Sequence, residues 1–135
     1  MSVVVDLNIL PGAYSISRLP VGPPLPGWIG GEGLVNVTQA ADEVSVVCRS
    51  DRVPGDIETS AGWTAIEVST TFDFDEAGVV LSVVRPISEA GLGVFVISTF
   101  LRDYLLVRRE ELAHAKSLLA AAGHRVSPDG GDYLS

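Results

Sequence analysis

Hydrophobic and polar residues alternate most regularly in the second half of the chain. Along residues 63–69, Ile66 and Val68 fall on one side, while Glu67 and Ser69 fall on the other. A strand with one buried face has this period of two, because successive side chains point to opposite faces of a sheet. The pattern predicts a β-strand that begins the second half.

The period then changes to that of a helix. Over residues 76–90, the polar residues Ser82, Arg85 and Glu89 recur at helical spacing. The opposite, apolar face is formed by Val80, Val83, Val84 and Ile87. Asp75 is placed to cap this segment, because its carboxylate can accept hydrogen bonds from the free amides of a first helical turn. The pattern predicts an amphipathic helix with Asp75 at its start.

Two strands, a helix and a last strand complete this half. Residues 94–100 and 103–109 are separated by too few residues for anything but a tight hairpin. Residues 110–122 carry a second helical stripe, and residues 124–127 form a short strand. The order β-α-β-β-α-β predicts a ferredoxin-like α+β fold, in which two helices cover one face of a four-stranded antiparallel sheet.

The first half is looser and richer in glycine and proline. Residues 3–10 alternate and predict a strand, and residues 13–19 predict another. The stretch 20–33 is so rich in glycine and proline that it leaves room for a short helix at most. Residues 34–39 and 43–48 then form a second hairpin.

The two hairpins resemble copies of one another. Positions 60 apart carry similar residues, polar ones included. The matching pairs are Val35 with Phe95, Val37 with Ile97, Thr38 with Ser98, Glu43 with Asp103, Val47 with Val107 and Arg49 with Arg109. We therefore predict two tandem units: a degenerate one over residues 1–61, which has lost most of its helices' length, and a complete one over residues 62–135.

Composition and charge narrow the class of protein. A hydrophobic content of 47% and a charged content of 19% are ordinary for a folded globular chain. The net charge of −8 disfavours nucleic-acid binding, which needs clustered Lys and Arg. No apolar run reaches the ~20 residues of a membrane helix, and the first ten residues lack a secretory signal. We expect a cytoplasmic protein in which the single cysteine, Cys48, is a small buried residue.

Three segments resemble a known family. Residues 86–107 (PISEAGLGVFVISTFLRDYLLV) resemble the ACT domains of the CASTOR type and of aspartokinase regulatory regions. Residues 10–20 and 62–68 are similar to small bacterial ACT proteins. The resemblance implies tandem ACT domains that pair and hold a small amino acid at their interface, without catalytic activity.

The resemblance does not carry over a ligand specificity. CASTOR-type relatives include arginine sensors, and aspartokinase regulatory regions respond to lysine or threonine. This chain has Leu101 and Arg102 where an acidic or small polar pair would better suit a cationic ligand.

An amino acid needs acceptors for its ammonium group and amide donors for its carboxylate, and the junction before the first predicted helix offers both. The amides at a helix start bind anions because the helix dipole and the unpaired donors point the same way. The predicted ligand-binding residues of this junction are Asp73, Asp75, Glu76, Ala77, Gly78 and Val79. The alternative is that these carboxylates simply cap the helix.

The hairpin tip of the second unit supplies the other part of the predicted site. Its ligand-binding residues are Ser98, Thr99, Phe100 and Asp103. The carboxylate of Asp103 could hold a ligand ammonium group while the turn contacts the rest. The alternative is an ordinary acidic turn residue that bonds to its own backbone.

Three functions remain open at this point: an amino-acid-responsive regulatory protein, a structural dimerisation module whose ligand site has decayed, and a small enzyme, since a ferredoxin-like fold alone does not determine function. We expect the first, with no catalytic residue, cofactor or metal, because neither His114 nor His124 has partners at metal-ligand spacing. We also expect a homodimer, because the short helices of the first unit cannot cover its sheet.

Overall fold

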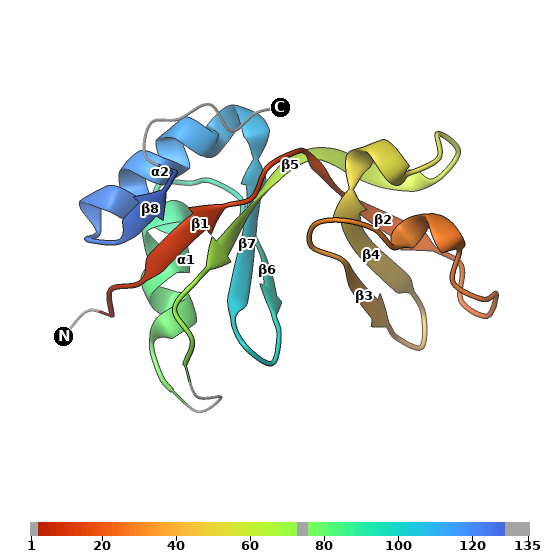
Figure 1. The fold of residues 1–135 in the computed structure, drawn as a ribbon, viewed down its shortest axis with the longest axis horizontal. Coiled ribbons are helices and arrows are strands. Elements are labelled where there is room, and N and C mark those ends of the chain that lie inside the picture. Colours follow the sequence, from red (N-terminus) through yellow and green to blue (C-terminus); the bar gives the residue numbers. More distant parts are fainter. Residues whose placement is uncertain (1–2, 73–75, 129–135) are drawn as a thin grey trace.

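The computed structural model describes residues 3–72 and 76–128, and it has two halves that share one long strand (Figure 1). In chain order the strands are β1 (Asp6–Ile9), β2 (Tyr14–Leu19), β3 (Asn36–Gln39), β4 (Val44–Arg49), β5 (Glu58–Val68), β6 (Phe95–Ser98), β7 (Asp103–Arg108) and β8 (Arg125–Ser127). The helices are α1 (Val79–Glu89) and α2 (Leu112–Ala121), and short 3₁₀ turns are η1 (Gly27–Ile29), η2 (Ser50–Arg52) and η3 (Arg109–Glu111).

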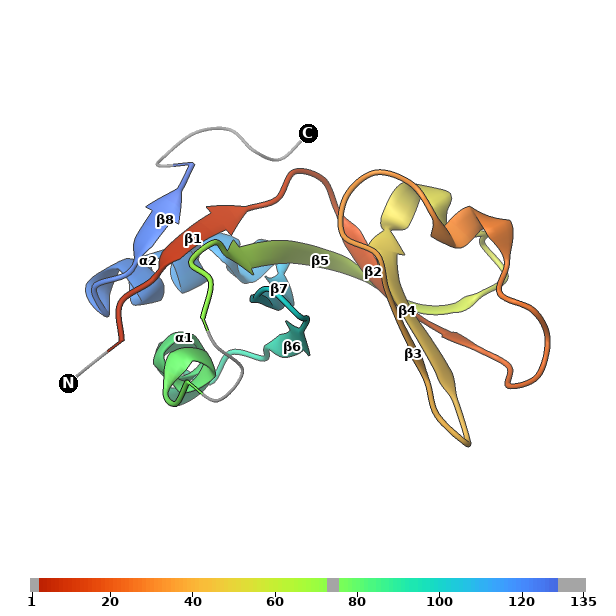
Figure 2. The ribbon, with the colours of Figure 1, turned by 60° about the horizontal axis from the view of Figure 1, so that its bottom comes forward.

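Strand β5 joins the two halves, and Figure 2 shows it running from one into the other. Its first part pairs with β2, and its last part pairs with β1 and β7. The register with β2 shifts where β5 passes between the halves, and Gly62 has a φ of 84° there. Glycine adopts this left-handed conformation without a steric penalty, so the strand can carry a bulge at this point.

The first half has the strand order of a ferredoxin-like sheet, and the second half has the same order with β1 inserted between β5 and β8. The first half is ordered β3-β4-β2-β5, and in the second half β6 and β7 lead through β5 to β1 and β8. Helices α1 and α2 pack together on one face of the second half, whereas the first half has only η1 and η2 in the corresponding connections. This confirms the predicted α+β, ferredoxin-like fold.

The place of β1 differs from the prediction. We expected it in the first unit, but it pairs antiparallel with β5 and parallel with β8 in the second half. The apolar side of the N-terminal segment, formed by Val5, Leu7 and Ile9, is buried in the core beneath the two helices. Burial of these side chains explains the placement, and the sheet of the second half therefore has five strands with one parallel pair, rather than four antiparallel strands.

The two hairpins are equivalent, but the offset between them is 59 positions rather than 60. In the first hairpin Asn36 pairs with Val47. In the second, Phe95 pairs with Leu106. The match at 60 arose because strands of both hairpins are rich in β-branched residues, so neighbouring registers resemble each other. A shift of one residue moves every side chain to the other face, so the hydrogen-bonded register decides which positions correspond.

A pair of cation–π contacts follows the corrected offset. The guanidinium of Arg49 lies 5.9 Å from the ring centre of Tyr14, at the end of the first hairpin. The guanidinium of Arg108, 59 positions after Arg49, lies 4.3 Å from the ring centre of Trp63. In both halves the arginine ends the hairpin and the aromatic residue lies on the neighbouring strand. The repeat therefore extends to side-chain contacts.

Three apolar clusters hold the molecule together. The largest lies between the two helices and the sheet of the second half. A second lies between the halves, where Tyr14 and Val47 pack with Ala65 and Leu106. The third lies beneath η1 and contains Cys48, which is fully buried, as predicted. Burial raises the pKa of the Cys48 thiol.

No helix within residues 3–72 and 76–128 is long and apolar enough to cross a membrane.

Candidate functional site

The start of helix α1 forms one side of the candidate site. Gly78 occupies the N-cap position and the helix begins at Val79, whereas we had expected the cap three positions earlier, at Asp75. The φ of Gly78 is 87°, a conformation that favours glycine, and glycine has no side chain with which to cap the helix. The first amides of a helix have no partner within the helix, so those after Gly78 are suitable donors for a ligand.

The turn between β6 and β7 forms the other side. The Ser98 hydroxyl donates to Oδ1 of Asp103 at 2.6 Å. The Thr99 amide donates to the Arg102 carbonyl at 2.9 Å, and the Arg102 amide donates back to the Thr99 hydroxyl at 3.3 Å. These bonds hold the turn and orient the Asp103 carboxylate. A carboxylate has room for several hydrogen bonds, so Asp103 can still accept from a ligand.

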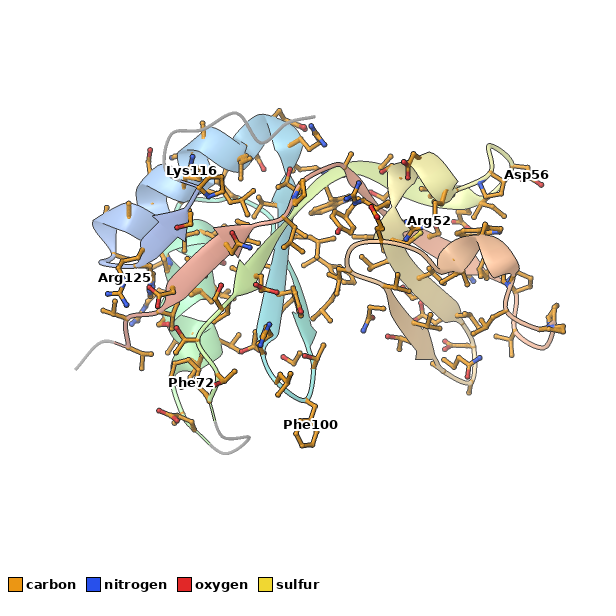
Figure 3. The ribbon with its side chains drawn as sticks, viewed as in Figure 1. Arg52, Asp56, Phe72, Phe100, Lys116 and Arg125 are labelled. Carbon is orange, nitrogen blue, oxygen red and sulfur yellow. The ribbon has the colours of Figure 1, made fainter. Side chains whose placement is uncertain are left out.

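The helix start and the turn enclose one pocket of about 270 Å³. Figure 3 shows Phe72 and Phe100 at the same end of the second half, one from the connection that follows β5 and the other from the hairpin tip. The described lining residues are Thr70, Phe72, Glu76, Gly78, Val79, Val80, Leu81, Ser98, Thr99, Phe100, Leu101, Arg102 and Asp103. The pocket thus joins the two segments that the sequence singled out separately.

The structure brings together most of the predicted site residues. Those that line the pocket are Glu76, Gly78, Val79, Ser98, Thr99, Phe100 and Asp103. Ala77 instead lines a neighbouring hollow with Ser82 and His124. Asp73 and Asp75 lie outside the described residues, so their predicted contact with a ligand stays a prediction.

Six lining residues were not predicted. They are Thr70, Phe72, Val80, Leu81, Leu101 and Arg102. The helical pattern assigned Val80 to the buried face, but its position in the first turn leaves it at the pocket. The sequence feature that could have identified some of them is the apolar pair Phe100 and Leu101 at a hairpin tip, because a turn of this kind is usually polar.

The charge of Arg102 is balanced within the protein. Its Nη1 lies 3.4 Å from Oε2 of Glu67, and both side chains are half-buried. Glu67 lies on β5 and Tyr104 lies opposite it on β7. Burial raises the pKa of Tyr104, and the nearby charge of Glu67 adds to this effect. The described residues include no group of three or more His, Cys, Asp or Glu placed to hold a metal.

Comparisons with known proteins identify the fold family. A family model of the ACT domain matches residues 58–121, and a model of an N-terminal domain matches residues 12–56. The crystal structure of protein Atu0741 from Agrobacterium tumefaciens is 41% identical, covers 99% of this chain and 100% of that one, and superposes with a TM-score of 0.91. The chain belongs to the ACT-domain proteins. No curated protein matches the chain.

More distant ACT-domain structures share the fold. The regulatory subunit of aspartate kinase from Thermus thermophilus is 9% identical with a TM-score of 0.62, over 90% of this chain and 99% of that one. The aspartate kinase of Clostridium acetobutylicum is 11% identical with a TM-score of 0.65, and the match covers 90% of this chain but 35% of that enzyme. These likenesses confirm the resemblance to aspartokinase regulatory regions at the level of the fold.

Proposed function

We propose that this ACT-domain protein is a non-catalytic regulatory protein that binds a small amino acid in the pocket between the start of α1 and the β6–β7 turn. The observation that carries the proposal is the meeting of the start of α1, at Gly78, with the Asp103 carboxylate in one pocket. The helix amides and dipole suit the ligand carboxylate. Asp103 suits the ammonium group, so the two halves of a zwitterion each find a complementary group.

The positions of the two histidines support a binding role over a catalytic one. His124 is buried and both of its ring nitrogens are engaged, one by the Val5 amide and the other by the Ser82 carbonyl. His114 lies on the exposed side of α2 and does not line the pocket. Neither is available to transfer a proton to a ligand in the pocket.

The first half offers no equivalent site among its described residues. The connection equivalent to α1 contains only η1, which has three residues and Pro26 at its N-cap position. A single 3₁₀ turn has almost no dipole, so it does not attract a carboxylate as α1 does. We therefore propose one amino-acid site per chain, in the second half.

Regulation requires that binding change an assembly or a partner, and we propose a homodimer in the cytoplasm as the working assembly. Val21 and Leu25 are exposed apolar side chains of the first half. Covering such side chains with a second copy is worth about 25 cal/mol per Å² of apolar surface. Light scattering at micromolar concentration measures this directly, and a mass of 14.2 kDa with and without amino acids would contradict the dimer.

A thermal-shift screen of the twenty amino acids tests the binding proposal, because a ligand that binds only the folded state raises its stability. Calorimetry with the best ligand then compares Asp103→Asn with Asp42→Asn. Asp42 lies at the tip of the first hairpin and outside the pocket, so it is a matched control.

We expect Asp103→Asn to weaken binding by about tenfold or more, as for the loss of one charge-assisted hydrogen bond, and Asp42→Asn to leave it unchanged. Equal affinities in the two variants would remove Asp103 from the site. A screen in which no amino acid raises the melting temperature would favour the structural dimerisation module instead.

A further inference from the structure

Exposed apolar side chains gather around the pocket. Val80, Leu81, Phe100 and Leu101 are 36%, 58%, 78% and 56% exposed, and all four line it. Single exposed apolar residues are common on protein surfaces, but a cluster that surrounds one pocket marks a surface that a ligand or partner covers. The half-buried Phe72 continues the cluster into the pocket.

The charged groups of the pocket leave little to attract a charged ligand side chain. Asp103 and the helix start are the groups that suit an amino acid's backbone. Arg102, the only Lys or Arg among the described lining residues, is already paired with Glu67. An acidic ligand side chain would face the lining carboxylate of Glu76 and would have to compete with Glu67 for this guanidinium. A basic one would face Arg102, and its pairing with Glu76 would be weak because Glu76 is exposed.

We propose that the ligand is a neutral amino acid with an apolar side chain, aliphatic or aromatic, which covers the exposed apolar side chains of the pocket. This inference rests on the proposed function, since it assigns the ligand class of the same site. A charged side chain placed against these apolar residues would lose water, which is unfavourable. The cavity of about 270 Å³ also lies at the lower limit for small-molecule sites, which suits one amino acid.

The Arg102–Glu67 ion pair then makes the pocket selective against acidic amino acids. While Glu67 neutralises Arg102, the described lining residues offer no other cation to an acidic ligand. Replacing Glu67 with glutamine removes the competing carboxylate and leaves the charge of Arg102 unbalanced. The Glu67→Gln variant should therefore gain affinity for glutamate and keep its affinity for leucine.

Calorimetry on the full chain with leucine, phenylalanine, alanine, serine, glutamate and lysine tests the ligand class. We expect leucine or phenylalanine to bind about tenfold or more tightly than alanine, because each added methylene in an apolar pocket is worth roughly that factor. Glutamate and lysine should bind more weakly than alanine.

A matched pair of variants tests the contact itself. Val80→Thr replaces a methyl group with a hydroxyl of the same shape at the pocket. Val35→Thr makes the same change at a residue that is also 36% exposed but does not line the pocket. We expect Val80→Thr to lower the affinity for leucine several-fold, because the variant loses part of the apolar contact that one methylene group makes. Val35→Thr should leave the affinity for leucine unchanged.

The outcomes separate the two proposals. If none of the six amino acids binds, the proposed function fails. If serine, glutamate or lysine binds as tightly as leucine, or if Val80→Thr weakens leucine binding no more than Val35→Thr, the function stands and the ligand class is wrong. If Val80→Thr dissociates a dimer without changing leucine affinity, a second copy covers the apolar side chains, and the inference is overturned.

Discussion

Replacing His124 should destabilise the protein, because this buried side chain ties together three segments of the second half. The imidazole is 5% exposed and lies just before β8. The Val5 amide donates to its Nδ1 at 3.1 Å, and its Nε2 lies 2.9 Å from the Ser82 carbonyl of α1. An amide can only donate, so Nδ1 must be the unprotonated nitrogen, and Nε2 then carries the proton that bonds to Ser82.

The size of the effect follows from these two bonds. His124→Ala leaves the buried Val5 amide without a partner, which costs about 1–3 kcal/mol. The Ser82 carbonyl is only partly buried, so its lost bond costs roughly 0.5–1.5 kcal/mol. With the removed ring contacts, we expect the free energy of unfolding to fall by about 2–4 kcal/mol, a large share of the 5–15 kcal/mol typical of a domain.

Urea unfolding followed by circular dichroism at neutral pH measures this change. His124→Asn keeps an acceptor near Nδ1, and His124→Gln keeps a donor near Nε2, so each should lose less stability than His124→Ala. The control is His114→Ala, which lies on the exposed side of α2 and should change the stability by less than about 0.5 kcal/mol. If His124→Ala is as stable as His114→Ala, the argument from the two hydrogen bonds is wrong.

Two further predictions concern the first half. Gly33→Ala should lower the free energy of unfolding by about 1–3 kcal/mol, because Gly33 has a φ of 86° and an added Cβ would lie 2.5 Å from the Tyr14 hydroxyl oxygen. The control in the same urea experiment is Gly55→Ala, because an added Cβ at Gly55 meets nothing within 4 Å. Cys48 should not react with an aromatic disulfide reagent until urea unfolds the chain, because the thiol is fully buried and burial raises its pKa. Rapid labelling of Cys48 in the native protein would contradict the placement of this residue in the core.

Much of the second half could be predicted from the sequence because local spacing decides it. The alternation around Ile66 and the helical stripe around Arg85 depend only on neighbours along the chain, and both elements are present. The junction before α1 and the turn before β7 were also identifiable, because glycine, hydroxyl and carboxylate residues are characteristic of loops that bind polar groups. Gly78 and Asp103 line the pocket, as such an argument expects.

Features that depend on contacts between distant segments could be determined only from the tertiary structure. The alternation of β1 fits a strand in either half, and only the burial of Leu7 beneath the helices selects the second half. The 59-residue offset depends on cross-strand hydrogen bonds, which similar β-branched sequences do not specify. The ion pair of Arg102 and Glu67 joins residues 35 positions apart, and the exposure of Val80 depends on how α1 sits against the hairpin. A sequence pattern determines which face of an element is apolar, but its partner is determined by the packing of the whole chain.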